Sequence, residues 1–144
     1  MFRTLTVTTP ASDLQLLSIE QMRMEVGVAD ASQDSRLTTV GLRIAADICT
    51  DCNVAVGIGA PPTLRRETLT ETFRWISGHT VTLGRRHEIE IVSVVENGVP
   101  LAASDFLVDP ESGLFMRLSG DYPTAWSPLL VTAIYSAGFS TVPG

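Results

Sequence analysis

The sequence predicts an α+β fold, in which a short N-terminal strand and two helices precede a small antiparallel β-domain. Two observations predict this order. Apolar residues recur at helical spacing in the first part of the chain, and after residue 63 the spacing falls from about 3.6 residues to about 2. The 144 residues suffice for one compact unit with its own core. We expect residues 1–60 to form the strand and the helices and residues 61–144 to form the β-domain.

The N-terminal part predicts a strand and a short capped helix. Residues 3–8, RTLTVT, alternate polar and apolar side chains, as a strand with one buried face does. Ser18 is placed to cap a helix, because Gln21 follows three residues later and completes a capping box. This first helix is expected to end near Gly27.

A second helix is expected to begin at Asp34 or Ser35, either of which can cap its N-terminus. Its apolar stripe is expected to contain Leu37, Val40, Gly41, Ile44, Ala45, Ile48 and Cys52. Its other side is polar and contains Arg36, Thr39, Arg43, Asp47 and Thr50. The segment AVGIGAPPT ends the helix, because two glycines and a Pro-Pro pair cannot continue it.

The remaining chain predicts short strands separated by turn residues. The first are LTETFRW, HTVTLG and EIEIVSVV, and Asn97-Gly98 then indicates a tight hairpin turn. The segments DFLVD, LFMRL and LLVTAIYSAGF follow as further strands. Most aromatic residues of this part are expected in its core or at its rim, namely Phe73, Trp75, Phe106, Phe115, Tyr122, Trp126, Tyr135 and Phe139.

Cys49 and Cys52 form a C-x-x-C pair, which in other proteins can be a redox centre or half of a zinc site. They are predicted in the last turn of the second helix, where the helix dipole raises the pKa of a thiol. His79 and His87 do not complete a zinc-finger spacing, and both are expected in solvent. We therefore expect thiols packed on and beside the helix stripe, with no metal and no redox chemistry.

No other pattern predicts an enzyme or a cofactor site. The segment GIGAPP lacks the third glycine of a dinucleotide-binding loop, and neither histidine accompanies a nucleophile motif. Asp105, Asp109 and Glu111 lack the spacing of a calcium loop and fit a polar hairpin turn. The formal net charge of -6 argues against a surface that binds nucleic acid. We expect no catalytic, metal-binding or cofactor-binding residues.

The N-terminus predicts neither a signal peptide nor a membrane anchor. The segment MFRTLTVTTP has no apolar core of the kind that signal peptides carry. No window approaches the roughly 20 apolar residues of a transmembrane helix. We expect an intracellular protein with no membrane partner.

The order of these segments resembles the head-tail connector proteins of tailed bacteriophages, prophages and gene transfer agents, also called adaptor or head-completion proteins. The resemblance runs from LTVTTP and LQLLSIEQMRMEVGV through DSRLTTVGLRIAADICTDCNV to the β-section. Its best local match is IEIVSVVENGVPLAASDFLVD, followed by a strand that ends in Ala137-Gly138-Phe139. Members of this family typically continue into C-terminal helices that complete a bundle and help to contact the portal, whereas this sequence extends to Gly144.

The resemblance implies a structural virion protein. Its copies are expected to form a ring beneath the portal, to follow the portal's twelve-fold symmetry, and to connect the DNA-filled head to the tail or a stopper protein. DNA would pass through the lumen without specific binding, which an acidic lining favours because it offers no cations to the phosphates. The expected location is the virion neck, and the host cytoplasm during assembly.

Contacts between copies are expected to join Arg85 and Arg86 of one subunit to Asp109 and Glu111 of the next. Two alternatives stay open. One is a small ligand-binding β-domain of the glycan-binding type on a structural protein, which would need several aromatic side chains aligned on one exposed face. The other is a thiol enzyme, which would need an accessible thiol of low pKa.

Overall fold

The computed structural model describes residues 1–141 and has the predicted α+β fold. Residues 142–144, the end of the predicted β-domain, lie outside the described residues. The helical elements are α1 (Ile19–Val26), η1 (Ala31–Gln33), α2 (Asp34–Asp51) and η2 (Ala103–Asp105). The strands are β1 (Phe2–Thr9), β2 (Glu67–Arg74), β3 (Thr80–Thr82), β4 (Glu90–Glu96), β5 (Val99–Pro100), β6 (Phe106–Val108), β7 (Leu114–Ser119), β8 (Tyr122–Pro123) and β9 (Val131–Ala137).

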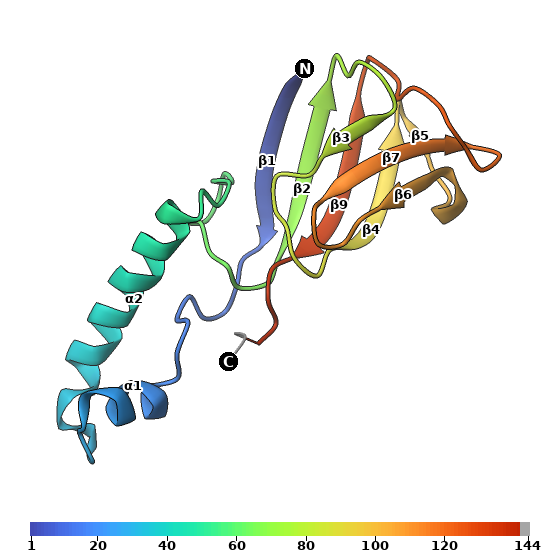
Figure 1. The fold of residues 1–144 in the computed structure, drawn as a ribbon. Coiled ribbons are helices and arrows are strands. Elements are labelled where there is room, and N and C mark those ends of the chain that lie inside the picture. The colour runs from blue at the N-terminus through green and yellow to red at the C-terminus, as the bar shows by residue number, and fades with distance from the viewer. Residues whose placement is uncertain (142–144) are drawn as a thin grey trace.

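The strands form two antiparallel sheets that pack against each other (Figure 1). The larger sheet has the order β1-β2-β9-β4-β5, and the smaller has the order β3-β7-β6 with β8 paired to β7. β1 precedes the helices in the sequence but pairs with β2, with Leu5 opposite Glu71. The helices α1 and α2 project from one side of this two-sheet body (Figure 1).

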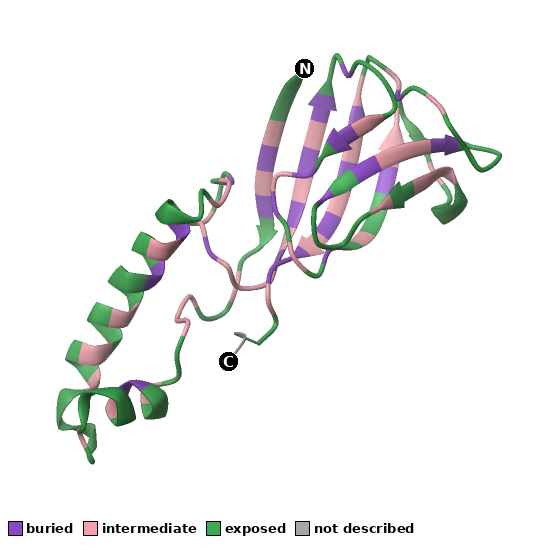
Figure 2. Cartoon of the chain, in the orientation of Figure 1, coloured by how far each residue is buried: buried purple, intermediate pink, exposed green. Residues whose placement is uncertain are grey.

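The hydrophobic core lies between the two sheets. Side chains along β2 and β9 alternate between buried and half-buried positions (Figure 2), which confirms the predicted period of two. The largest fully buried side chains include Trp126, Tyr135, Phe73, Phe115 and Leu69. With the half-buried Phe106 and Phe139 they confirm the prediction for most aromatic residues, whereas Trp75 and Tyr122 are exposed.

The predicted helix cap and hairpin turn are both confirmed. The N–H of Gln21 donates to Ser18 Oγ at 3.1 Å, and the N–H of Ser18 donates to Gln21 Oε1 at 2.8 Å. Gly27 ends α1 with a left-handed φ of 74°. Asn97 and Gly98 join β4 to β5 with φ values of 48° and 81°, which a tight hairpin turn requires.

The predicted packing of α2 is wrong in part. Ala45 and Cys49 are the buried residues of this helix, whereas Val40, Ile44 and Cys52 of the predicted stripe are exposed. Among the described elements α2 contacts α1 and η1 but no strand, and α1 lies across the N-terminal end of α2 (Figure 1). Most of the surface of α2 is therefore exposed (Figure 2). Within residues 1–141, no helix is long and apolar enough to cross a membrane.

Candidate assembly interface

Arg85 lies inside the fold, although the sequence predicts it at a subunit interface. Its side chain is 5% exposed, and its Nη1 lies 3.0 Å from Oε1 of Glu67, whose side chain is fully buried. Its Nε donates to the carbonyl of Ala55 at 2.6 Å, and its Nη1 also donates to the carbonyl of Thr63 at 3.2 Å. The guanidinium thus ties the segment after α2 to β2 within one chain.

Arg86 and Glu111 lie at one corner of the molecule. Both line an open hollow of about 930 Å³ between the segment after α2 and the β-domain. Arg86 is exposed, while Glu111 Oε2 lies 3.2 Å from His87 Nδ1 in the same chain. A ring contact joins two different faces of neighbouring subunits. Arg86 and Glu111 lie at the same corner, so a pairing of Arg86 with the neighbour's Glu111 would require this corner to belong to both faces. That pairing stays a prediction.

Asp109 shapes the turn between β6 and β7. Its carboxylate accepts the hydroxyl of Ser112 at 2.7 Å and the N–H of Glu111 at 3.1 Å. These hydrogen bonds, of which the one from Ser112 has the largest effect, hold the pKa of Asp109 below its ordinary value. Asp109 is nevertheless exposed, and a carboxylate can accept further hydrogen bonds. The polar hairpin turn predicted here is confirmed for Asp109 and Glu111, whereas Asp105 ends η2 before β6.

A second buried carboxylate, Glu71, connects β1, β2 and β9. Its side chain is fully buried, accepts the hydroxyl of Tyr135 at 2.6 Å and the N–H of Gly84 at 3.0 Å, and lies 3.3 Å from Nε of Arg3. Burial raises the pKa of Glu71 despite these partners. Burial and, second, the charge of Glu71 raise the pKa of Tyr135 as well. The network fastens the edge strand β1 to the body.

The raised pKa of Glu71 gives a pH-dependent contribution to stability. A carboxyl whose pKa is higher in the folded state than in the unfolded state stabilises the fold most at pH values below its unfolded-state pKa. This stabilisation is lost as the pH rises through its folded-state pKa. We therefore expect the free energy of unfolding of wild type, minus that of Glu71→Gln, to be larger at about pH 4.5 than at about pH 8. Urea denaturation of both proteins at the two pH values measures this difference in free energy. The contributions of the other carboxylates are common to both proteins and cancel in the difference. A difference that grows with pH would contradict the assignment.

The C-x-x-C pair is divided between two environments. Cys49 is buried, and burial raises the pKa of its thiol, whereas Cys52 is exposed at the C-terminal end of α2. The predicted packed thiol is therefore confirmed for Cys49 and wrong for Cys52. In the part of the chain that the structure describes, no three His, Cys, Asp or Glu side chains gather where they could hold a metal ion.

Phe2 and Trp75 form an exposed aromatic pair at one end of the β1–β2 ladder. Their side chains are 55% and 66% exposed, and their rings meet at 62° with centroids 6.1 Å apart. Rings at this angle do not form one flat face on which a sugar ring could stack. This pair therefore gives no support to the glycan-binding alternative.

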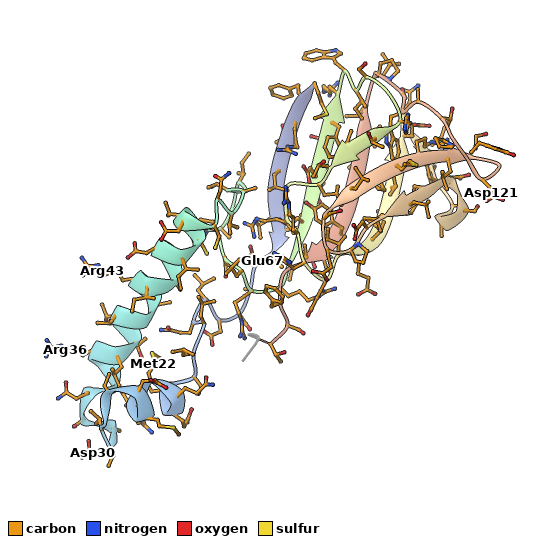
Figure 3. All side chains as sticks on the ribbon, in the orientation of Figure 1. Met22, Asp30, Arg36, Arg43, Glu67 and Asp121 are labelled. Atoms are coloured by element: carbon orange, nitrogen blue, oxygen red, sulfur yellow. The ribbon has the colours of Figure 1, made fainter. Side chains whose placement is uncertain are left out.

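The outward side of α2 is the most distinct uncovered surface of the helical part. Val40 and Ile44 are 45% and 51% exposed there. Arg36 and Arg43 lie beside them, and both point away from the two-sheet body (Figure 3). Among residues 1–141, neither arginine forms an ion pair. The surface combines apolar and cationic side chains that have no partner within the described chain.

The fold itself has a counterpart among solved structures. A chain described as "Neck of empty GTA particle computed with C6 symmetry" matches 99% of this chain and 74% of its own length, with a TM-score of 0.60 and 18% sequence identity. The chain has the fold of a gene transfer agent neck protein. No family model matches the sequence, and no curated protein is significantly similar to it.

Neither the uncovered face of α2 nor the two buried carboxylates, Glu67 and Glu71, were predicted from the sequence. Glu67 and Glu71 alternate with Leu69 and Phe73 along β2, so the period of two places all four on the buried face. That period was visible in the segment ETLTETF and could have identified both glutamates. Nothing in the sequence shows that one face of α2 stays uncovered, because that depends on where the helix packs.

Proposed function

We propose that this chain is a structural protein of the neck of a virion-like particle, and that it is not an enzyme. The observation that carries the proposal is the shared fold, which extends over 99% of the chain and belongs to a chain from the neck of a gene transfer agent particle. The order of segments in the sequence supports the same class of protein independently of the three-dimensional fold.

Copies of the chain form a ring beneath the portal and connect the DNA-filled head to the tail or to a stopper protein. The C6 symmetry in the description of the matching structure supports a ring, and a twelve-fold ring contains six-fold symmetry. The helices that project from the body, with exposed apolar side chains, suit a chain that completes its packing in an assembly. The chain resides in the virion neck and, during assembly, in the host cytoplasm.

DNA passes through the ring without specific binding. The net charge of -6 supports this, because a cationic lining would hold the phosphates and slow the DNA. Replacement of lumen-facing carboxylates by lysine is expected to slow or block DNA ejection. Ejection rates that match those of wild type would contradict an acidic lumen.

Deletion of this chain tests the proposed function. Without a connector, we expect DNA-filled heads and free tails to accumulate as separate species in electron micrographs, and complementation with the wild-type chain to restore joined particles. Joined and infectious or transducing particles in the absence of the chain would overturn the proposal.

A further inference from the structure

Two surfaces on opposite sides of the molecule are complementary in charge and in apolar character. The first, the α2 face, consists of Arg36, Val40, Arg43 and Ile44. At about 100° per residue these four side chains fall within about 100° of the helix circumference. Asp47 and Asp51 follow on the same side nearer the C-terminus, so the cationic part of this side ends at Arg43, near the middle of α2.

The second surface, the β6 edge, consists of Asp105, Leu107 and Asp109. β6 is the edge strand of the smaller sheet. Leu107 is 58% exposed, whereas its neighbours Phe106 and Val108 pack against the core, so Leu107 points outward. In the described part of the chain, neither aspartate forms an ion pair. An apolar side chain thus stands between two carboxylates without cationic partners.

The spacing of the charges agrees on the two surfaces. Arg36 and Arg43 are seven residues apart on a helix, which corresponds to about 10 Å at about 1.5 Å per residue. Asp105, the last residue of η2, and Asp109, the residue after β6, are four residues apart, which corresponds to at most about 13 Å at about 3.3 Å per residue. The flexible methylene stems of the arginines can accommodate the difference. Val40 and Ile44 would then lie over Leu107, between the two charge pairs.

We infer that the α2 face of one copy docks onto the β6 edge of the next copy. α2 and β6 lie on opposite sides of one molecule (Figure 1), so they cannot meet within a chain. Two different and complementary faces on opposite sides produce a heterologous contact, which closes into a ring when the rotation permits. This docking rests on the proposed ring. Of the interface residues predicted from the sequence it keeps Asp109, uses Asp105 in place of Glu111, and uses Arg36 and Arg43 of α2 in place of Arg85 and Arg86.

Disulfide trapping tests the docking in assembled particles. The variant carries Ile44→Cys and Leu107→Cys with Cys52→Ser, while the buried Cys49 is left unchanged. Under mild oxidation we expect neighbouring copies to be cross-linked into a ladder of oligomers on a non-reducing gel. Leu129→Cys in place of Leu107→Cys is the matched control, because Leu129 is 59% exposed against 58% for Leu107, and it is expected to give no ladder.

Charge reversal on the α2 face supplies a second readout. In the same cysteine background, Arg36→Glu with Arg43→Glu is expected to abolish the ladder, whereas Arg74→Glu, at another exposed arginine, is expected to preserve it. Assembled rings that yield no ladder with Ile44→Cys and Leu107→Cys would overturn this docking and leave the proposed function intact. A chain that is absent from the particles would overturn both.

Discussion

Replacement of Arg85 by methionine is expected to lower the free energy of unfolding by about 3–5 kcal/mol. Arg85 and Glu67 have side-chain exposures of 5% and 0%, with 3.0 Å between their charged atoms. Removal of the guanidinium leaves a buried carboxylate without its counter-ion and the carbonyls of Ala55 and Thr63 without their donor. The expected loss therefore comes from the folding of one chain and does not depend on assembly.

Denaturant unfolding of the isolated chain measures this loss. Arg86→Met is the matched control, since Arg86 is the next residue and is exposed, and its effect is expected within about 0.5 kcal/mol. An Arg85→Met variant with wild-type stability that fails to form rings would contradict the internal role. It would instead support Arg85 at a subunit interface.

Gly138→Ala is the second substitution with a large expected effect. Gly138 follows β9 with a φ of 106°, and an added Cβ would lie 2.6 Å from the carbonyl oxygen of Arg65 and 2.8 Å from its carbonyl carbon. Both are backbone atoms of the segment before β2, which Phe139 holds in place, since its N–H donates to the carbonyl of Leu64 and its carbonyl accepts the N–H of Arg66. Backbone strain and steric overlap together are expected to cost at least about 2 kcal/mol.

Gly78→Ala separates the two causes of that cost. Gly78 has a φ of 90°, close to that of Gly138, but nothing lies within 4 Å of an added Cβ. Thermal or denaturant unfolding should therefore show a smaller loss for Gly78→Ala, which carries the backbone strain alone. Equal losses for the two variants would show that the contact with Arg65 contributes nothing.

Local patterns predicted the elements of this fold because the interactions that form them are local. The capping box at Ser18 and Gln21 and the turn at Asn97-Gly98 each involve residues within four positions of one another. The period of two along β2 and β9 likewise identified two strands that prove to be neighbours in the larger sheet.

The same patterns could not separate Arg85 from Arg86. The two residues are adjacent and chemically identical, and the partners of the buried one, Glu67 on β2 and the carbonyls of Ala55 and Thr63, are distant in the sequence. The packing of α2 was missed for a related reason. Its apolar stripe predicts a buried side, but which residues of the stripe become buried depends on what packs against the helix, and here Ala45 is buried whereas Val40 and Ile44 are exposed.

We propose above all that this chain forms a ring at the neck of a virion-like particle. Quantitative mass spectrometry of purified particles, with the copy number of this chain measured against that of the portal protein, tests it most directly. A neck ring that follows the portal predicts equal copy numbers. Absence of the chain from the particles, or a copy number like that of the major capsid protein, would contradict the claim.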